Sequence, residues 1–253
     1  MDLGIAGRSA LVTGASRGIG FAIAKGLAKE GVRVVLNSRN QKSLKGAVET
    51  IKRESADVYG EVGDVSDFEE IKSLIVRTQS LIGNPDIVIS NAGGPKVGPT
   101  ESLQEVDWLA AFNSTFMSSV RLTRLTVPAM RKQGWGRIIN VTSISVKEPV
   151  PRLALSNAYR AAVTSYAKTL ASEIASDGIT VNGVGPGYTA TDRLKEIMGK
   201  GKAMESLKEA IPAKRFATPD EIAAVCVFLA SQQAGYVTGQ TIFPDGGLLS
   251  SVH

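Results

Sequence analysis

Histidine and cysteine are almost absent from this sequence, since its 253 residues contain one of each. A single cysteine excludes a disulfide within the chain, which is typical of a protein from a reducing compartment. Cys226 lies in the apolar run 223–229, so we expect a small buried side chain rather than a reactive thiol. The only histidine, His253, is the last residue, which argues against a histidine-based mechanism and against a metal site.

Long apolar runs are also lacking, as are low-complexity tracts and internal repeats. No run reaches the roughly 20 residues that a membrane-spanning helix needs, and residues 1–4 carry neither a basic nor an apolar leader region. The formal charge of +5 comes from lysines and arginines scattered among acids, without an aromatic stripe, so we expect no nucleic-acid partner. We expect a cytoplasmic protein with no membrane partner, built as one domain over residues 1–253.

Strand-like and helix-like patterns alternate along the whole chain. Short runs rich in β-branched residues are separated by segments whose apolar residues have helical spacing. Seven strands are expected, at residues 9–12, 33–37, 58–62, 86–90, 137–142, 179–184 and 240–244. This alternation predicts an α/β fold of the Rossmann type, a doubly wound parallel sheet of about seven strands with helices on both faces.

Three segments need separate expectations. The helical pattern over residues 103–132 is expected to break near Asn113, and Ser66 is expected to cap a helix because Glu69 follows three residues later. Residues 188–212 are rich in Lys, Glu, Met and Gly and are only partly helical in pattern. Since ligands of open α/β sheets lie beyond the carboxyl ends of the strands, we expect this last segment to form a lid.

Three glycines stand between the first expected strand and the first expected helix, in the stretch Thr13–Gly20. Gly14 permits a tight turn, Gly18 allows the backbone to approach a pyrophosphate, and Gly20 allows the helix to pack closely against the strand. The N-terminus of the helix offers unpaired N–H groups to phosphate oxygens. This context favours dinucleotide binding over an ordinary turn.

The spacing Gly14-x-x-x-Gly18-x-Gly20 resembles the glycine turn of the classical short-chain dehydrogenase/reductase family. Further motifs occur in the order that this family shows, after successive strands: Asp64-Val65, Asn91-Ala92-Gly93, Ser143 and Pro186-Gly187. The stretches Ile-Thr-Val-Asn at 179–182 and Pro-Asp-Gly-Gly at 244–247 are most similar to the 3-oxoacyl-acyl-carrier-protein reductase branch. The resemblance covers nearly the whole chain and implies an NAD(P)(H)-dependent oxidoreductase that assembles as a homo-oligomer, a tetramer or a dimer.

The resemblance also implies a cofactor site. It implies that Asp64 lies near the adenine and that Thr189 and Thr191 bind the carboxamide of the nicotinamide. The expected cofactor-binding residues are Gly14, Ser16, Arg17, Gly18, Ile19, Gly20, Ser38, Arg39, Asp64, Val65, Asn91, Ala92, Gly93, Arg160, Pro186, Gly187, Thr189 and Thr191.

The choice between NADP(H) and NAD(H) can be argued from charge. An acid about 20 residues beyond the glycine turn usually binds the ribose 2′-hydroxyl, whereas a 2′-phosphate repels a carboxylate and favours arginine. Here Ser38-Arg39 follow the second strand without an acid, and Arg17 lies in the glycine turn. Two guanidinium groups suit a phosphate, so NADP(H) is favoured. NAD(H) remains the alternative if both arginines are only solvated loop residues.

The Tyr-x-x-x-Lys motif of the family is absent, because none of the five tyrosines has a lysine four positions later. The family's spacing, counted from Ser143, puts Ser156 in the tyrosine position and Arg160 in the lysine position. The flanking Arg-Ala-Ala-Val at 160–163 is similar to the family's Lys-Ala-Ala-Val. The resemblance therefore implies Ser143, Ser156, Arg160 and Asn113 as catalytic residues.

This replacement leaves the source of the proton open. A serine hydroxyl is a far poorer proton donor than a tyrosine beside a lysine. The proton could come from water, from Tyr159 or Tyr188, or through a relay at Asn113; equally, Tyr159 could only pack against a neighbour and Tyr188 only line the pocket. Two functions follow: an oxidoreductase that interconverts a carbonyl and an alcohol, with a 3-oxoacyl thioester as the suggested substrate, or a nucleotide-binding regulatory protein with weak or no catalysis.

Overall fold

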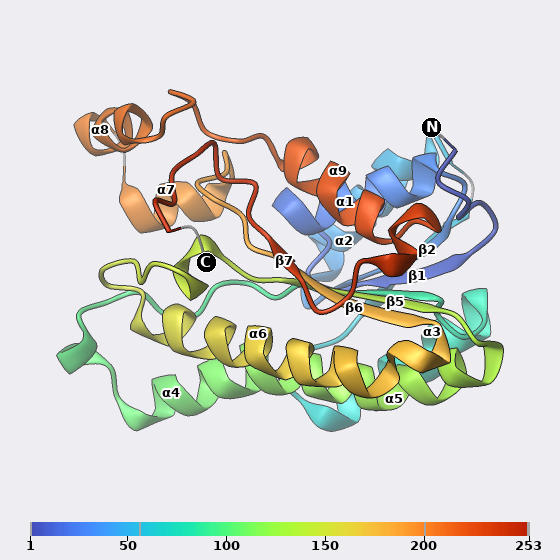
Figure 1. Ribbon diagram of the computed structural model, residues 1–253. Coiled ribbons are helices and arrows are strands. Elements are labelled where there is room, and N and C mark those ends of the chain that lie inside the picture. Colours follow the sequence, from blue (N-terminus) through green and yellow to red (C-terminus); the bar gives the residue numbers. More distant parts are fainter. Residues whose placement is uncertain (1, 56, 200, 252–253) are drawn as a thin grey trace.

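A computed structural model describes residues 2–55, 57–199 and 201–251, so the prediction about His253 falls outside it. Seven parallel strands form one sheet at the centre of the molecule, in the order β3-β2-β1-β4-β5-β6-β7 (Figure 1). They are β1 (Ser9–Val12), β2 (Arg33–Ser38), β3 (Val58–Val62), β4 (Ile87–Ser90), β5 (Gly136–Val141), β6 (Ile179–Val184) and β7 (Thr241–Ile242). The order reverses between β1 and β4, which is where ligands bind in such sheets. The predicted fold class is confirmed.

Helices cover both faces of this sheet (Figure 1). One face carries α1 (Gly18–Lys29), α2 (Gln41–Lys52) and α9 (Pro219–Leu229), and the other carries α3 (Phe68–Ile82), α4 (Glu105–Ala111), α5 (Ser118–Gln133) and α6 (Ala154–Ile174). Two further helices, α7 (Asp192–Met198) and α8 (Lys202–Ala210), stand beyond the carboxyl ends of the strands. The short helical turns are η1 (Thr100–Ser102), η3 (Ile144–Val146), η4 (Ala175–Asp177) and η5 (Gln233–Tyr236).

The five inner strands, β2, β1, β4, β5 and β6, are buried on both faces, and alternate residues enter two different cores. Val12 and Ile89 pack with α1, α2 and α9, whereas Leu11 and Val88 pack with α3, α5 and α6. Side chains of a strand point alternately to its two sides, so a strand that is covered twice is apolar throughout. The two cores fix the sheet, and the loops at the carboxyl ends of the strands are left to form the site.

The predicted break near Asn113 is a π-helical turn, η2 (Phe112–Met117), between α4 and α5. The prediction that Ser66 caps α3 is wrong. The cap is Asp67, whose side chain accepts from the backbone N–H of Glu70 at 2.9 Å, because the Ser66 hydroxyl donates to Asp64 instead. The last strand is shorter than predicted, since β7 pairs only with residues 183 and 184.

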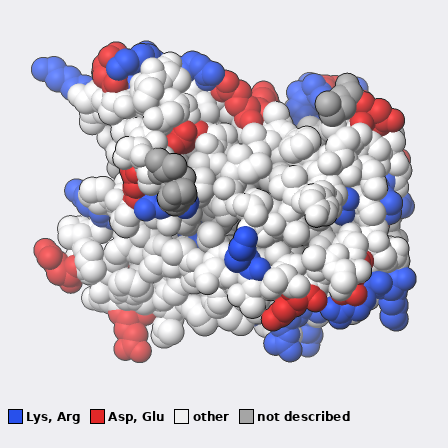
Figure 2. Space-filling view, in the orientation of Figure 1, with Lys and Arg blue, Asp and Glu red and all other residues white. Residues whose placement is uncertain are grey.

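Charged residues are mixed on the surface. Figure 2 shows Lys and Arg interspersed with Asp and Glu around the margin of one face, with a mainly uncharged middle. Within the part of the chain that the structure describes, no helix has the length and apolar character needed to cross a membrane. Among the same residues, no three His, Cys, Asp or Glu side chains gather as a metal site would require.

Candidate active site

A cleft of about 390 Å³ opens at the carboxyl ends of β1, β4, β5 and β6, on the side where α7 lies. Sixteen of the predicted site residues line it: Gly14, Arg17, Gly18, Ile19, Gly20, Arg39, Asn91, Ala92, Gly93, Ser143, Ser156, Arg160, Pro186, Gly187, Thr189 and Thr191. Five other predicted residues are not among its lining in the described part of the chain: Ser16, Ser38, Asp64, Val65 and Asn113. Parallel strands bring their carboxyl ends to one edge, which explains why distant motifs meet here.

The glycine turn has no room for a side chain at Gly14 or Gly20. A Cβ on Gly14, whose φ is +58°, would lie 2.7 Å from the Asn91 carbonyl oxygen, and one on Gly20 would lie 2.4 Å from the Gly14 carbonyl oxygen. Asn91 holds the turn from β4, because its side-chain amide donates to the carbonyls of Thr13 and Gly14 at 3.2 and 3.1 Å. The turn is therefore rigid and open to a ligand on its cleft side.

The N-terminus of α1 faces this turn. The residue before the helix, Arg17, makes no side-chain cap within the described structure, and the first turn contains no acid. Unpaired N–H groups and the helix dipole therefore remain available to an anion. A glycine cradle beside a free helix N-terminus fits the pyrophosphate of a dinucleotide, so these residues fit the cofactor that the sequence predicts.

Polar side chains surround the far end of the cleft, beyond β2 and β3. Arg39 is 74% exposed, and its Nη1 lies 3.5 Å from Asp64 Oδ2. Burial would raise the pKa of the Asp64 carboxyl, but hydrogen bonds from the Ser66 N–H and hydroxyl, together with the charge of Arg39, hold it below its ordinary value. The Ser38 hydroxyl donates a hydrogen bond to the Ser16 hydroxyl at 3.0 Å. Arg39 is thus a solvent-exposed cation next to a serine pair, without an acid on β2 itself.

The reaction end of the cleft contains Ser143, Ser156 and Arg160. Arg160 reaches from α6 to the end of β5, where its Nη1 donates to the carbonyls of Val141 and Thr142 at 2.7 and 3.1 Å. Its Nε donates to Ser156 Oγ at 3.1 Å, while Ser143 Oγ accepts from the Ser145 N–H at 3.1 Å. Both serine oxygens accept a hydrogen bond, and each hydroxyl keeps a proton that it can donate.

Burial, and next the charge of Arg193, lower the pKa of Arg160 to about 10. The guanidinium is therefore still protonated at neutral pH, and it places a positive charge against the Ser156 hydroxyl. A cation and hydroxyl donors that line the same cleft can stabilise negative charge that develops on an oxygen atom there.

The two tyrosines considered as proton donors lie in different places. Tyr188 lines the cleft, and burial raises the pKa of its hydroxyl. Tyr159 is absent from the lining in the described chain; it packs edge-on against Trp108, with ring centroids 6.1 Å apart, and against Phe112 at 5.8 Å. Tyr188 is consequently the tyrosine that can meet a substrate.

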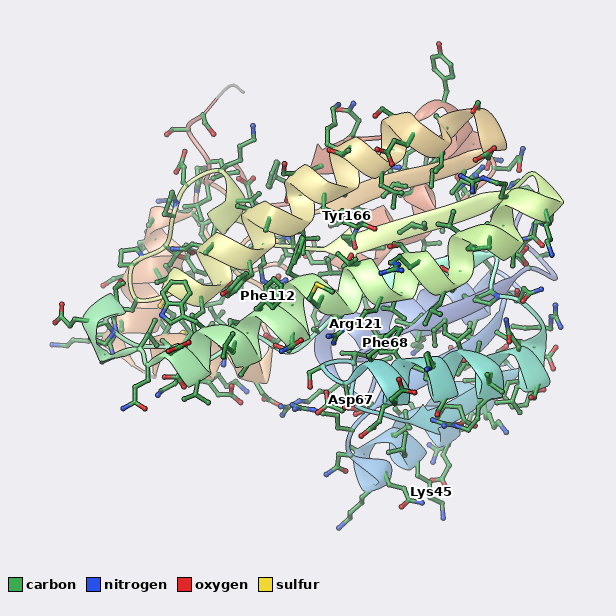
Figure 3. All side chains as sticks on the ribbon, turned by 90° about the horizontal axis from the view of Figure 1, so that it is seen from below. Lys45, Asp67, Phe68, Phe112, Arg121 and Tyr166 are labelled. Atoms are coloured by element: carbon green, nitrogen blue, oxygen red, sulfur yellow. The ribbon has the colours of Figure 1, made fainter. Side chains whose placement is uncertain are left out.

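Asn113 lies on the helix face below the sheet, in the π-helical turn. Its side-chain amide donates to the Leu109 carbonyl at 3.1 Å, and its carbonyl oxygen accepts from Arg121 Nη2 at 2.9 Å. Figure 3 shows Arg121 on α5 pointing toward Phe68 of α3, while Phe112 and Tyr166 lie between α5 and α6. The geometry thus ties Asn113 to Arg121 rather than to the serines.

Arg193 is one of several cleft residues that the sequence reasoning missed. Arg193, in the first turn of α7, donates from Nη2 to the Pro95 carbonyl at 2.6 Å. Arg193 lies two positions after the predicted residue Thr191, and this closeness in sequence was the signal that could have identified it.

Comparison with known proteins gives matches over nearly the whole chain. The family profile described as enoyl-(acyl carrier protein) reductase matches residues 14–249. A dehydrogenase/reductase SDR family member 4 from Bos taurus is 37% identical over 242 residues, spanning 95% of this chain and 87% of its own. A 3-oxoacyl-acyl-carrier-protein reductase from Staphylococcus epidermidis is also 37% identical over 242 residues, spanning 95% and 98%.

Solved structures match equally well. The L-sorbose reductase from Gluconobacter frateurii, complexed with NADPH and L-sorbose, superposes with a TM-score of 0.93 over all of both chains at 36% identity.

Proposed function

Because the chain belongs to the classical short-chain dehydrogenase/reductase family, we propose that it is an NADP(H)-dependent oxidoreductase that interconverts a carbonyl and an alcohol. The observation that supports this most is the convergence of Ser143, Ser156 and Arg160 on the cleft that the glycine turn borders. The glycine turn would hold the cofactor, and the serines and arginine would hold the reacting oxygen.

NADP(H) is the cofactor that we propose, and it supplies the hydride when bound. Gly14, Gly18 and Gly20 would admit its pyrophosphate, and Arg17 and Arg39 would bind the 2′-phosphate. Arg39 fits this role because its tip is exposed and its partner, Asp64, lies on the neighbouring loop rather than on β2. The relative from Gluconobacter frateurii, solved with NADPH, supports the choice.

The divergent pair Ser156 and Arg160 would take over the roles of the missing tyrosine and lysine. The Ser143 and Ser156 hydroxyls would donate to the substrate oxygen, and the Arg160 cation would stabilise the charge that develops there. Arg160 keeps its proton at neutral pH, so it would orient Ser156 and not titrate. We assign the proton to water or to Tyr188, since Tyr159 packs among aromatic side chains away from the cleft lining of the described residues.

We propose that α7 and α8, within residues 188–212, form the lid, and that the chain is a homo-oligomer of one-domain subunits. The lid proposal rests on α7, whose residues in the cleft lining are Asp192, Arg193, Leu194, Glu196, Ile197 and Met198. The mainly uncharged middle of the face in Figure 2 supports association with a second copy. A cytoplasmic location is part of the same proposal.

One observation favours a second function. The absence of Tyr-x-x-x-Lys removes the proton donor on which the family's chemistry depends, so a nucleotide-binding regulatory protein with little catalysis is the alternative.

The experiment is NADPH consumption by the purified protein with a panel of 3-oxoacyl thioesters, simple ketones and sugars, with the product identified by chromatography. Turnover that drops about a hundredfold in Ser143→Ala, the cost of one lost oxyanion donor, supports the oxidoreductase. Tight NADPH binding without turnover on any member of the panel supports the regulatory protein.

A further inference from the structure

Arg193 and Arg160 both line the cleft, from α7 and α6 respectively. Arg193 lies in the first turn of α7, and its Nη2 donates to the Pro95 carbonyl on the loop after β4 at 2.6 Å. A Cβ on Gly94 would lie 2.6 Å from Arg193 Nε and 2.7 Å from its Nη2. The guanidinium therefore lies directly against the backbone of residue 94, and a side chain at that position would displace it. The side chain is 34% exposed, so one edge of the group still meets the cleft.

Within the described chain, Arg160 has no acid among its hydrogen-bond partners, whereas Arg193 has Glu196. The hydrogen bonds of Arg160 reach neutral oxygens, those of Ser156, Val141 and Thr142. The charge of Arg193 disfavours the charged form of Arg160, which shows that the two groups interact. Like charges in a partly buried cleft repel each other, and a further anion bound beside them would relieve that repulsion.

The acids that line the cleft in the described chain are both engaged near its rim. Asp192 lies 3.4 Å from Lys195 and 4.0 Å from Arg17. Glu196 contacts Arg193 Nη1 at 3.3 Å and is 52% exposed. An exposed pair of this kind contributes little, so Glu196 can yield to a stronger anion. Its contact also shows that the outer edge of Arg193 is accessible to a carboxylate.

The start of α7 lies close to the glycine turn, since a Cβ on Gly18 would be 3.4 Å from Thr191 and Asp192 is 4.0 Å from Arg17. The Arg193 guanidinium points elsewhere, because it bonds Pro95 and packs against Gly94 in the loop after β4. Arg193 and Tyr188 line the same cleft as Ser156. Arg193 is therefore positioned to meet an anion that the substrate carries.

We infer that the substrate is a small oxo acid or hydroxy acid, whose carboxylate is bound by Arg193 while Ser143 and Ser156 hold its carbonyl or hydroxyl oxygen. Arg193 is then the residue that determines specificity. The inference rests on the proposed function: a carbonyl gains a hydride from the cofactor and one proton, and becomes the alcohol. It names the substrate class that the resemblance leaves open.

The test compares Arg193→Met with the natural protein on matched substrates. The panel consists of 2-oxo and 3-oxo acids of small size, each paired with its methyl ester, which removes only the charge. We expect kcat/KM for the acid to fall by about ten- to a hundredfold, the value of a charge-assisted hydrogen bond. The value for the ester and the Kd of NADPH should stay within about twofold, and Arg193→Lys should restore part of the activity on the acid.

Lys195→Met is the matched control, because Lys195 lies on the same helix and pairs with Asp192 at the surface. Lys195→Met should leave kcat/KM unchanged for both the acid and the ester. An equal loss on acid and ester, or a weaker Kd for NADPH in Arg193→Met, would overturn the inference. Esters that are better substrates than their acids in the natural protein would overturn it as well.

A measurement of anion binding distinguishes a failure of this inference from a failure of the proposed function. Succinate, which has no carbonyl to reduce, is titrated calorimetrically into the NADPH-loaded protein. Binding that Arg193→Met abolishes, in a protein that turns over nothing, supports the anion site and contradicts the oxidoreductase. Turnover of neutral ketones without any succinate binding supports the oxidoreductase and contradicts the anion site.

Discussion

Replacing Arg160 by methionine should disable catalysis while leaving the glycine turn and Arg39 of the cofactor site unchanged. Methionine has a similar length but neither charge nor donors. The change removes the hydrogen bond to Ser156 Oγ at 3.1 Å and the bonds to the carbonyls of Val141 and Thr142 at 2.7 and 3.1 Å. Ser156 is then no longer held, and no cation lies beneath the reacting oxygen.

The magnitude follows from those contacts. Loss of one donor or charge at a developing oxyanion costs about 2.7–4 kcal/mol, so kcat should fall by about a hundred- to a thousandfold. The two carbonyls at the end of β5 lose a charged partner, which should lower the free energy of unfolding by about 1–3 kcal/mol. The Kd of NADPH should change by less than about tenfold, because the glycine turn and Arg39 are untouched.

The assay is NADPH consumption on the best substrate of the panel, with Kd from cofactor fluorescence and stability from urea denaturation. Lys168→Met is the control, since Lys168 is an exposed cation on the same helix. The pH profile adds a second readout. The pKa of Arg160 is about 10, so the activity that depends on its protonated form should be flat near neutral pH and fall as pH rises through that value. A kcat for Arg160→Met within threefold of the natural protein would refute this reasoning.

Other substitutions test the rest of the site. Gly20→Ala should weaken NADPH binding at least about tenfold and lower the Tm, because its Cβ would lie 2.4 Å from a backbone oxygen. The matched control is Gly46→Ala in α2, where the Cβ meets open space; it should raise the Tm slightly, because alanine favours the helix more than glycine does. Arg39→Ala should raise the Kd of NADPH by about tenfold and leave that of NADH unchanged, whereas equal losses would contradict the assigned 2′-phosphate contact. Tyr188→Phe should lower kcat if that hydroxyl supplies the proton, while Tyr159→Phe should not; unchanged kcat in both leaves water as the donor.

Much of the fold could be predicted because its signals are local. Buried parallel strands are continuous apolar runs, and β1, β3 and β6 begin and end at the predicted residues. The ends of other elements depend on tertiary contacts. The α3 cap moved from Ser66 to Asp67 because the Ser66 hydroxyl bonds Asp64.

The site was predictable to the extent that it consists of motifs at the ends of strands. The sheet gathers those motifs, so the glycine turn, Asn91, Ser143 and Arg160 meet in one cleft. The sequence could not show which way a helical side chain points. Asn113 therefore accepts a hydrogen bond from Arg121, and Arg193 lines the cleft although no sequence motif marks it.

The most direct test of the account is to compare NADPH consumption by the natural protein with that of the double variant Ser156→Tyr/Arg160→Lys, which restores the family's motif. The account predicts clear turnover by the natural protein on at least one carbonyl substrate, lost on Ser156→Ala. A natural protein that binds NADPH tightly but turns over nothing, while the double variant becomes active, would contradict it.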